Sequence, residues 1–384
     1  MTPRILAIAG SDSGGGAGIQ ADIKTVTMLG GHAATAVTAV TAQNTLGVDA
    51  VHPIPVDVVL AQIDAVVSDI GVDAIKIGMI GSARTAAALA ERLGELRGVP
   101  IVLDPVMVAS SGARLADPAT IAGFARLMDV ATLVTPNLPE LEALGGDPHR
   151  LAERHGCAVL VKGGHAAGEL VTDRLHSAAP GQPPLIEWSD PRIDGHADHG
   201  TGCTLSSAIA CGLAQEWTLP EAIARARRFV RLAMHDAPGI GRGRGPMGQG
   251  AVRLDLNASR WSPMLNQVTV PADDIPASEK FYRTLGLRQI VRSSRRYARF
   301  ETEGGATFSI EMVDATTRPV VYFEVGDLDV ACRYLRQQGI PCGEVEERPW
   351  GWREVRLTDP AGNGVCLYQA GEMRRFPPWR IDRA

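Results

Sequence analysis

The stretch ILAIAGSDSGGGAGIQADI, from Ile5 to Ile23, decides the fold of the first part of this 384-residue chain. Ile5–Ala9 is a short apolar run of the kind found in buried strands, and Ile19–Leu29 has helical spacing of apolar residues. Between them, Gly10–Gly18 is rich in glycine, which lets backbone N–H groups come close to a ligand. Its spacing fits neither GxxxxGK[ST] nor GxGxxG with an acidic partner. Alone, this loop is as consistent with a structural turn as with a ligand site.

Short apolar runs continue to alternate with helical stretches up to about Gly250. Further strands are predicted at Ala74–Ile80, Ile101–Leu103, Thr132–Thr135 and Val159–Val161, and further helices at Val56–Asp69, Ala83–Arg97 and Pro220–Ala237. This alternation is typical of an α/β fold with a mostly parallel sheet and helices on both faces. We expect the first domain to span residues 1–250, with 238–250 as a closing loop, and residues 251–263 to be a linker.

Residues 264–371 contain an internal repeat with an offset of 53 residues. The repeated features are an apolar strand, an aspartate before a helix and a glycine after it (Val268–Val270, Asp274 and Gly286, then Val321–Phe323, Asp327 and Gly339). The repeat predicts a smaller α+β domain of two tandem βαβββ units, each with its own curved sheet, around a shared cleft. We expect residues 372–384 to be a C-terminal tail.

Composition excludes several classes of function. The net charge of −5 and the absence of a Lys/Arg-rich run give no support for a nucleic-acid or membrane partner. The first apolar run is too short for a signal peptide or a membrane span. Six cysteines without regular spacing indicate reduced thiols, so we expect a cytoplasmic protein.

A second candidate site lies at His199–Thr204, directly before the apolar helical run Leu205–Leu213. Backbone amides at a helix N-terminus can hold a transferring phosphoryl group. Cys203 would lie in the first helical turn, where the helix dipole should lower its pKa and make it usable as a base. The alternative is that Cys203 is simply a small buried side chain at a helix start.

Three further motifs follow predicted strands. Asn137 and Glu140, three residues apart where a helix begins, can organise a magnesium ion and its waters. Asp104 also stands at a strand end, where open α/β sheets bind their ligands. Lys162 precedes two glycines and is one of only four lysines in a chain with 38 Lys and Arg, so it suggests a point charge for phosphate.

Together these motifs resemble the ribokinase-like superfamily and, within it, the hydroxymethylpyrimidine/phosphomethylpyrimidine kinases of thiamine biosynthesis. The segments that carry the resemblance are Ile8–Asp12, Gly18–Thr25, Thr38–Thr45, Lys76–Met79 and Gly200–Leu205. The resemblance covers about residues 4–250 and implies phosphorylation of 4-amino-5-hydroxymethyl-2-methylpyrimidine and of its monophosphate, with ATP and Mg²⁺ as cofactors. The alternatives are a kinase for another pyridine or pyrimidine alcohol, such as pyridoxal, and a sugar kinase, although sugar kinases usually carry Asp where Cys203 stands.

The resemblance also implies roles for individual residues. Gln43 would bind the aminopyrimidine edge, because an amide both donates and accepts. The other residues expected to line the pyrimidine pocket are Asp12, Asp22, Met79 and Val106. Gly200, Thr201, Gly202 and Cys203 would form the anion hole, with Cys203 as base. Asp104, Asn137 and Glu140 would organise magnesium, and Lys162 and Thr201 would bind the nucleotide phosphates. His199 is expected to be a hydrogen-bonded part of the scaffold.

The second domain resembles the vicinal-oxygen-chelate superfamily of glyoxalases, dioxygenases and antibiotic-resistance proteins, with Asp359–Asn363 as its closing turn. Metal ligands in that superfamily lie on the first and last strands of each repeat. The matching positions are Gln267, Glu311, Val320 and Cys366. Valine cannot bind a metal and the set has no histidine, so we predict a metal-free module for small-molecule binding or dimerisation. The alternative is an independent enzyme or resistance-type binder. Both families suggest a homodimer.

Overall fold

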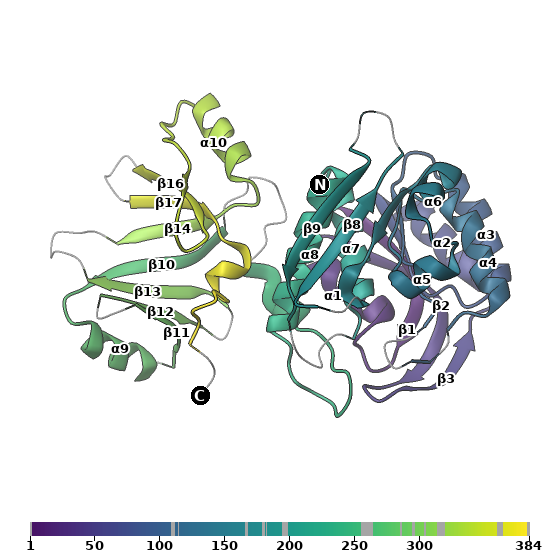
Figure 1. Cartoon of the computed structure of the whole chain (residues 1–384), viewed down its shortest axis with the longest axis horizontal. Helices are drawn as coiled ribbons and strands as arrows, with labels where there is room; N and C mark the ends of the chain where they lie inside the picture. Colours follow the sequence, from purple (N-terminus) through teal and green to yellow (C-terminus); the bar gives the residue numbers. More distant parts are fainter. Residues whose placement is uncertain are drawn as a thin grey trace. The chain divides into compact units, whose positions relative to one another are not determined.

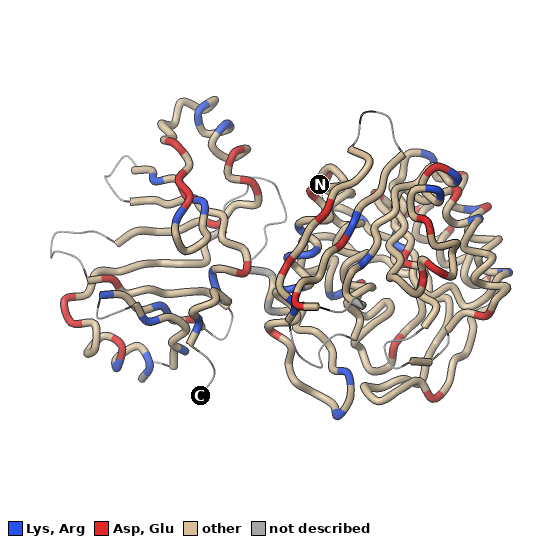
Figure 2. Tube along the Cα trace, viewed as in Figure 1, with Lys and Arg blue, Asp and Glu red and all other residues tan. Residues whose placement is uncertain are grey.

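The computed structural model describes residues 2–108, 112–113, 115–165, 168–178, 181, 183–193, 199–254, 264–284, 286–293, 296–302, 305–312, 319–358 and 364–381. The chain divides into two compact units, residues 1–250 and 251–384 (Figure 1). Basic and acidic residues are interspersed along the trace of both units (Figure 2). Among the described residues, the structure has no helix that combines the length and apolar character needed to span a membrane.

The first unit is built on one sheet, whose strands are β1 (Arg4–Asp12), β2 (His32–Gln43), β3 (Val48–Pro53), β4 (Ala74–Ile77), β5 (Ile101–Leu103), β6 (Leu133–Val134), β7 (Ala158–Val161), β8 (Leu170–His176) and β9 (Leu185–Pro191). Within the described residues, these nine strands are ordered β3-β2-β1-β4-β5-β6-β7-β8-β9. The six central strands are parallel to one another. At one edge β3 pairs antiparallel with β2, and at the other edge β8 pairs antiparallel with both β7 and β9. The predicted α/β class is confirmed.

Helices cover both faces of this sheet. They are α1 (Gly18–Met28), α2 (Val56–Asp69), α3 (Ala83–Gly94), α4 (Pro118–Met128), α5 (Leu138–Ala143), α6 (Pro148–His155), α7 (Thr201–Ala214) and α8 (Leu219–His235), with 3₁₀ turns at η1 (Gly163–His165) and η2 (Gln249–Leu254). Helices α2, α3 and α4 pack with one set of strand side chains in a single apolar core. Helices α1 and α7 pack together against β1 on the opposite face.

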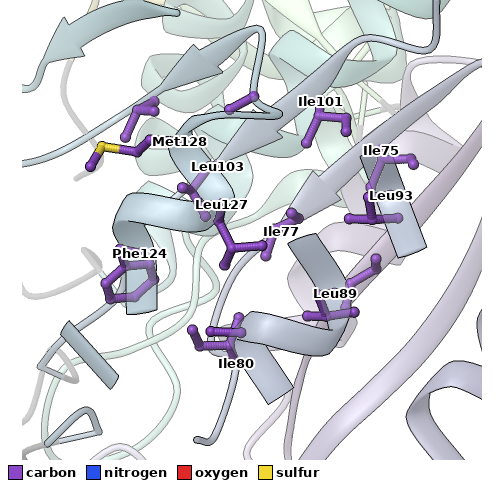
Figure 3. Packing of buried hydrophobic residues seen from close by; sticks show 14 of the residues in the cluster. Ile75, Ile77, Ile80, Leu89, Leu93, Ile101, Leu103, Phe124, Leu127 and Met128 are labelled. Atoms are coloured by element: carbon purple, nitrogen blue, oxygen red, sulfur yellow. The ribbon is translucent and has the colours of Figure 1, made fainter. Parts of the chain in front are cut away.

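The core beneath α3 and α4 shows why continuous apolar runs become central strands. Ile75 and Ile77 of β4 belong to one buried apolar cluster with Leu89 of α3 and Phe124 of α4, and all four side chains are inaccessible to solvent (Figure 3). A parallel strand is buried on both faces, so it has no polar face in its sequence. Polar side chains that can reach a ligand therefore collect where these strands end, and these strand ends meet at one edge of the sheet.

Several elements were missed or misplaced by the sequence prediction. Helix α2 has the predicted bounds, but the predicted strand Ala74–Ile80 ends at Ile77, and the predicted helix Ala83–Arg97 ends at Gly94. Strand β2 was missed because its sequence, HAATAVTAVTAQ, is dominated by small residues. The β8–β9 hairpin was missed because its strands are partly exposed and mix polar with apolar residues.

The second unit contains β10 (Met264–Ala272), α9 (Ile275–Thr284), β11 (Arg288–Ser293), β12 (Tyr297–Glu301), β13 (Thr307–Met312), β14 (Val320–Glu324), α10 (Leu328–Gln337), β15 (Glu346–Glu347), β16 (Arg353–Thr358), β17 (Gly364–Gln369) and the 3₁₀ turn η3 (Gly371–Arg374). This element order repeats βαβββ as predicted. The described strands form one eight-stranded sheet, β11-β12-β13-β10-β14-β17-β16-β15. The expectation of a separate sheet for each repeat was wrong, because β10 and β14 pair directly in antiparallel register.

The closing turn Asp359–Asn363 and most of the predicted linker (residues 255–263) lie outside the described residues. The predicted C-terminal tail is in part a packed segment. Arg374 is fully inaccessible to solvent, and the amide of Ile381 donates to the carbonyl of Ile290 in β11 at 2.9 Å.

Candidate active site

A cavity of about 640 Å³ opens at the carboxyl ends of the parallel strands in the first unit. It is lined by twelve of the thirteen residues predicted for the kinase site: Asp12, Gln43, Met79, Asp104, Val106, Asn137, Glu140, Lys162, Gly200, Thr201, Gly202 and Cys203. These residues come from seven segments that are far apart in the sequence, and the sheet brings their ends together. Their individual chemical roles remain predictions.

Asp12 organises the glycine-rich loop. Its carboxylate accepts hydrogen bonds from the amides of Gly14, Gly16 and Ala17, at 2.8, 3.0 and 2.8 Å. Burial raises the pKa of Asp12, but the bond from His199 and these backbone bonds outweigh burial and leave its pKa below the usual value. Asp12 therefore stays ionised, and its charge holds the loop.

His199 links Asp12 to Gln43. Its Nε2 lies 3.0 Å from Asp12 Oδ2 and 3.1 Å from the amide end of Gln43. A carboxylate can only accept, so His199 Nε2 carries the proton, and Gln43 must then turn its oxygen toward that nitrogen. The Gln43 amide nitrogen can then donate to Thr41 Oγ1, which itself donates to the carbonyl of Ser11 at 3.0 Å. The expected scaffold residue His199 thus lies in the cavity wall and orients Gln43.

The glycine loop and the start of α7 meet backbone to backbone. Gly200 has a φ of +83°, and a Cβ there would lie 2.0 Å from the carbonyl oxygen of Gly16. A Cβ at Gly16 would lie 2.3 Å from His199 Cδ2. No residue with a side chain fits at either position. The contact brings Asp12 and His199 next to the helix N-terminus that follows Gly200.

Helix α7 offers backbone donors to the cavity. Gly200 is its N-cap, and Thr201, Gly202 and Cys203 form its first turn. The first amides of an α-helix have no acceptor within the helix, and the helix dipole adds partial positive charge there. A Cβ at Gly202 would lie 3.1 Å from Asp104 Oδ2 and 3.3 Å from Lys162 Nζ. The donors therefore stand beside the charged groups of the site.

The expectation that Cys203 has a lowered pKa was wrong. Burial raises the pKa of its thiol to about 11, although the nearby Lys76 ammonium acts to lower it. The sequence identifies the helix start and its dipole, but not the desolvation of the sulfur. Deprotonation of Cys203 therefore needs a further favourable charge.

Asp22 does not line the cavity, contrary to the prediction. It is fully buried and forms an ion pair of 2.9 Å with Lys76, which is also fully buried. Lys76 Nζ lies 2.9 Å from both carboxylate oxygens, and Oδ1 also accepts from Ser207 Oγ of α7 at 2.7 Å. Burial raises the pKa of Asp22, while Lys76 and Ser207 act against that rise. Asp22 thus anchors a buried cation between β4 and α7 and leaves no oxygen for a substrate.

Asp104, Lys162 and Glu140 form a charged group on another wall of the cavity. Lys162 Nζ lies 2.7 Å from Asp104 Oδ1 and 3.7 Å from Glu140 Oε2. Thr135 Oγ1 also donates to Asp104 Oδ1 at 3.1 Å. Burial raises the pKa of Glu140, with Lys162 opposing and Asp104 reinforcing that rise. Two carboxylates share one ammonium, so the group has a net negative charge that suits a cation.

Asn137 and Glu140 have a structural role in addition to their place in the cavity. They form a capping box at the start of α5, with the Asn137 amide bonded to Glu140 Oε2 at 2.8 Å and the Glu140 amide to Asn137 Oδ1 at 2.9 Å. Across the part of the chain that the structure describes, no three His, Cys, Asp or Glu side chains converge as a metal site. Magnesium at Asp104 and Glu140 would therefore have to complete its shell with water and nucleotide phosphate oxygens.

The predicted closing loop 238–250 borders the same cavity through Arg244. The Arg244 amide donates to the carbonyl of Thr45 at 3.0 Å, and a Cβ at Gly243 would lie 2.1 Å from that oxygen. Sequence analysis missed this placement. The available signal was a pair of arginines within a glycine-rich stretch.

The four candidate metal positions in the second unit do not converge. Gln267 is opposite Tyr322, which is opposite Cys366, whereas Glu311 is opposite Pro271. Four residues along a strand separate Gln267 from Pro271, which is about 13 Å. Gln267 Oε1 accepts from Thr307 Oγ1 at 2.8 Å, and Glu311 is exposed. Val320 has no donor atom, and burial raises the pKa of Cys366 to about 12. These residues do not fit a metal centre.

The profile of the phosphomethylpyrimidine kinase family matches residues 12–248. The chain belongs to this family. A hydroxymethylpyrimidine/phosphomethylpyrimidine kinase of Rhizobium meliloti is 46% identical over 64% of this chain and 97% of its own length. A bifunctional thiamine biosynthesis protein of Geobacter sulfurreducens is 48% identical over 63% of this chain and 51% of its own length, so this chain spans about half of that relative.

Solved structures of similar proteins extend this family placement. A phosphomethylpyrimidine kinase from Clostridium difficile has a TM-score of 0.52 and 36% identity, covering 60% of this chain and 98% of its own. A pyridoxal kinase of Bacillus subtilis, solved with ADP, has a TM-score of 0.60 and 31% identity, covering 66% of this chain and 100% of its own. The second unit of this family member matches the Glyoxalase/Bleomycin resistance protein/Dioxygenase superfamily over residues 264–367.

The buried Asp22–Lys76 pair of this phosphomethylpyrimidine kinase family member leads to a prediction about stability. Asp22→Asn removes the carboxylate but leaves the Lys76 ammonium buried, which should lower the free energy of unfolding by about 3–5 kcal/mol. Urea unfolding of the full chain measures this loss. Asp73→Asn is the matched control, because Asp73 pairs with Arg4 where both side chains are partly exposed, and its loss should be much smaller. Equal losses in the two variants would show that the buried pair has no special importance.

Proposed function

We propose that this protein transfers the γ-phosphoryl group of ATP to 4-amino-5-hydroxymethyl-2-methylpyrimidine and then to its monophosphate, which gives the pyrimidine diphosphate for thiamine biosynthesis. The observation that carries the proposal is that one cavity holds both an oriented amide and a helix N-terminus beside charged groups. Gln43 stands on one wall, and Gly200–Cys203 stand next to Asp104 and Lys162. An oriented amide suits the hydrogen-bonding edge of a planar heterocycle, and a helix N-terminus beside a lysine suits a triphosphate. A kinase for such a heterocycle needs both groups in one cavity.

The Gln43 amide is suited to the aminopyrimidine edge. His199 and Thr41 fix its orientation, so its remaining N–H and oxygen lone pair point in defined directions. The cavity is also lined by Met79 and Val106, which supply apolar surface for a flat ring. A ring held by Gln43 would direct its hydroxymethyl group toward the start of α7.

The amides of Thr201, Gly202 and Cys203 would stabilise negative charge on the transferring group. Phosphoryl transfer has a loose transition state, so positioning and charge neutralisation supply most of the rate. Lys162 would bind nucleotide phosphates, and Asp104 and Glu140 would hold Mg²⁺. That ion, when bound, neutralises phosphate charge. Because Cys203 has a raised pKa, it can accept a proton only to the extent that its thiol is already ionised.

Pyridoxal is the second candidate substrate. The observation that favours it is the similarity to solved pyridoxal kinases, including one from Staphylococcus aureus in complex with pyridoxal, with a TM-score of 0.58 and 31% identity. The pyrimidine remains the leading proposal because the relative from Rhizobium meliloti, with 46% identity, is a hydroxymethylpyrimidine/phosphomethylpyrimidine kinase. The further proposals are that the protein is a homodimer and that it acts in the cytoplasm, in keeping with its six free thiols.

Product analysis tests the proposed reaction. Full-length protein with hydroxymethylpyrimidine and Mg-ATP should form the monophosphate first and the diphosphate later, as followed by mass spectrometry. Formation of neither phosphate, under conditions in which ATP binds, would contradict the proposal.

Light scattering on the same preparation should give the mass of a dimer. The mass of a monomer would contradict the proposed homodimer.

Replacing Gln43 should weaken the pyrimidine and not the nucleotide. Gln43→Leu removes a donor and an acceptor at similar volume, so the KM for the pyrimidine should rise by the equivalent of about 1–3 kcal/mol, while the KM for ATP stays nearly constant. Gln62→Leu is the matched control, since Gln62 bonds to the backbone of Val37 and does not line the cavity. A parallel rise of both constants in Gln43→Leu would show that Gln43 supports the fold only.

The role of Cys203 can be tested through pH. If its thiolate accepts the proton, kcat/KM should increase as pH rises from 7 toward the pKa of about 11, because the ionised fraction grows. Cys203→Ala should lose this increase and turn over slowly, while ATP affinity persists because the helix amides remain. A flat wild-type profile with a fully active Cys203→Ala protein would remove Cys203 from the mechanism.

A further inference from the structure

The second unit closes part of its own sheet with its C-terminal segment, Gly371–Ile381. The start of this segment is held by Glu324, the last residue of β14. Glu324 Oε1 accepts from the amides of Ala370 and Gly371 at 3.2 and 2.9 Å. It ends at β11, where the Ile381 amide donates to the carbonyl of Ile290. Figure 1 shows this segment in yellow, running from the end of β17 toward β11. It therefore crosses from one repeat to the other.

Arg374 is the most deeply placed side chain of the segment. It is 0% exposed, and its Nη1 donates to the carbonyl of Gly305 at 2.9 Å and to Thr307 Oγ1 at 3.2 Å. A longer bond of 3.4 Å reaches the carbonyl of Asn266, and Nε lies 3.6 Å from Glu324 Oε2. The guanidinium thus touches β10, β13 and β14. A fourth strand joins through Tyr368 of β17, whose hydroxyl donates to Asn266 Oδ1 at 2.6 Å.

A second buried carboxylate, that of Glu301, forms ion pairs with two further arginines of the segment. Glu301 at the end of β12 is 2% exposed. Arg375 Nε lies 3.3 Å from its Oε2, and Arg380 Nη2 lies 2.8 Å from its Oε1. Arg288 of β11 also pairs with it. Two inward-facing carboxylates, one from each repeat, are therefore matched by arginines of the C-terminal segment.

Arg374 contacts three of the four strands on which this superfamily holds its metal, namely β10, β13 and β14. The four side chains at the expected positions do not fit a metal. The guanidinium supplies positive charge among these strands and satisfies their carbonyl and hydroxyl oxygens. A divalent ion brought beside it would meet an unfavourable like charge in a buried setting.

We propose that the segment Gly371–Ile381 is a permanent internal occupant of this face of the sheet, and that the positive charge of Arg374 excludes a divalent ion from the strands that it contacts. The carboxylate of Glu324 pairs with Arg374 through Oε2 and accepts from the amides of Ala370 and Gly371 through Oε1. The second unit is accordingly a closed, metal-free module. This inference does not depend on the substrate proposed for the first unit.

Hydrogen exchange on the full chain tests the permanence of the segment. Amides of residues 371–381 that are bonded in the structure should be protected to the same degree as amides of β10. Exchange of the segment at the rate of an unfolded peptide, with β10 still protected, would overturn the proposal. This measurement uses the wild-type protein, so it stands even if variants fail to fold.

Variants of Arg374 test its charge. Arg374→Met should reduce protection in β10 and in the segment by about tenfold or more, with no change in the peptides of the first unit. Arg374→Lys keeps the charge and should have a smaller effect. The double variant Glu324→Gln with Arg374→Met should lose less than the sum of the single variants, because the unpaired buried carboxylate is gone. Additive effects in the double variant, or no effect in Arg374→Met, would contradict the role of Arg374.

A metal titration completes the test. Untagged wild-type protein without nucleotide should show no saturable Ni²⁺ binding that depends on Glu324 or on the predicted ligand Glu311. Stoichiometric Ni²⁺ binding that disappears in Glu324→Gln or in Glu311→Gln would overturn the proposal and establish a metal centre in the second unit.

Discussion

The contact between the backbones of Gly16 and Gly200 is the constraint on which the active site depends. The two residues are distant in sequence, yet a single added Cβ at Gly200 would lie 2.0 Å from the Gly16 carbonyl oxygen. This approach brings the loop after β1 against the start of α7, so that Asp12 and His199 are in hydrogen-bonding distance. His199 then orients Gln43 together with Thr41. The ring-binding wall and the phosphate-binding helix terminus are thereby joined.

In both units, buried charged side chains are paired with side chains of opposite charge from distant parts of the chain. In the first unit, Asp22 meets Lys76 without solvent contact, and Lys162 lies between Asp104 and Glu140. In the second unit, Glu301 and Glu324 meet arginines of the C-terminal segment. A buried ion is costly unless it is paired and hydrogen-bonded, and each of these pairs joins segments from separate parts of the chain. The pairs therefore favour one specific arrangement of those segments over other compact ones.

The sequence predicted most of the fold because local patterns carried the information. Continuous apolar runs gave the central strands, and regular spacing gave α2 with its bounds. Strand β2 lacked that signal, since alanine and threonine fit several structures equally well. The join between the two repeats also escaped prediction, because β10 and β14 pair through backbone groups that leave no trace in residue types.

The candidate site was predictable to the extent that it follows from motifs at strand ends. Burial and partners were not. Asp22 stands on a helix and could face solvent or core, and only its contact with Lys76, 54 residues away, decides this. The pKa of Cys203 depends on desolvation by neighbours from several segments. Arg374 looked like part of a polar tail because Glu324, Thr307 and Asn266, which surround it, lie 50 or more residues earlier.

The central claim is that the first unit acts on a pyrimidine alcohol, and a competition assay tests this most directly. The full-length protein would be given equal concentrations of hydroxymethylpyrimidine and pyridoxal, with limiting Mg-ATP, and both phosphorylated products would be measured over time. The account predicts that the pyrimidine monophosphate forms first and in large excess, followed by the diphosphate. Pyridoxal 5′-phosphate as the main product would contradict it.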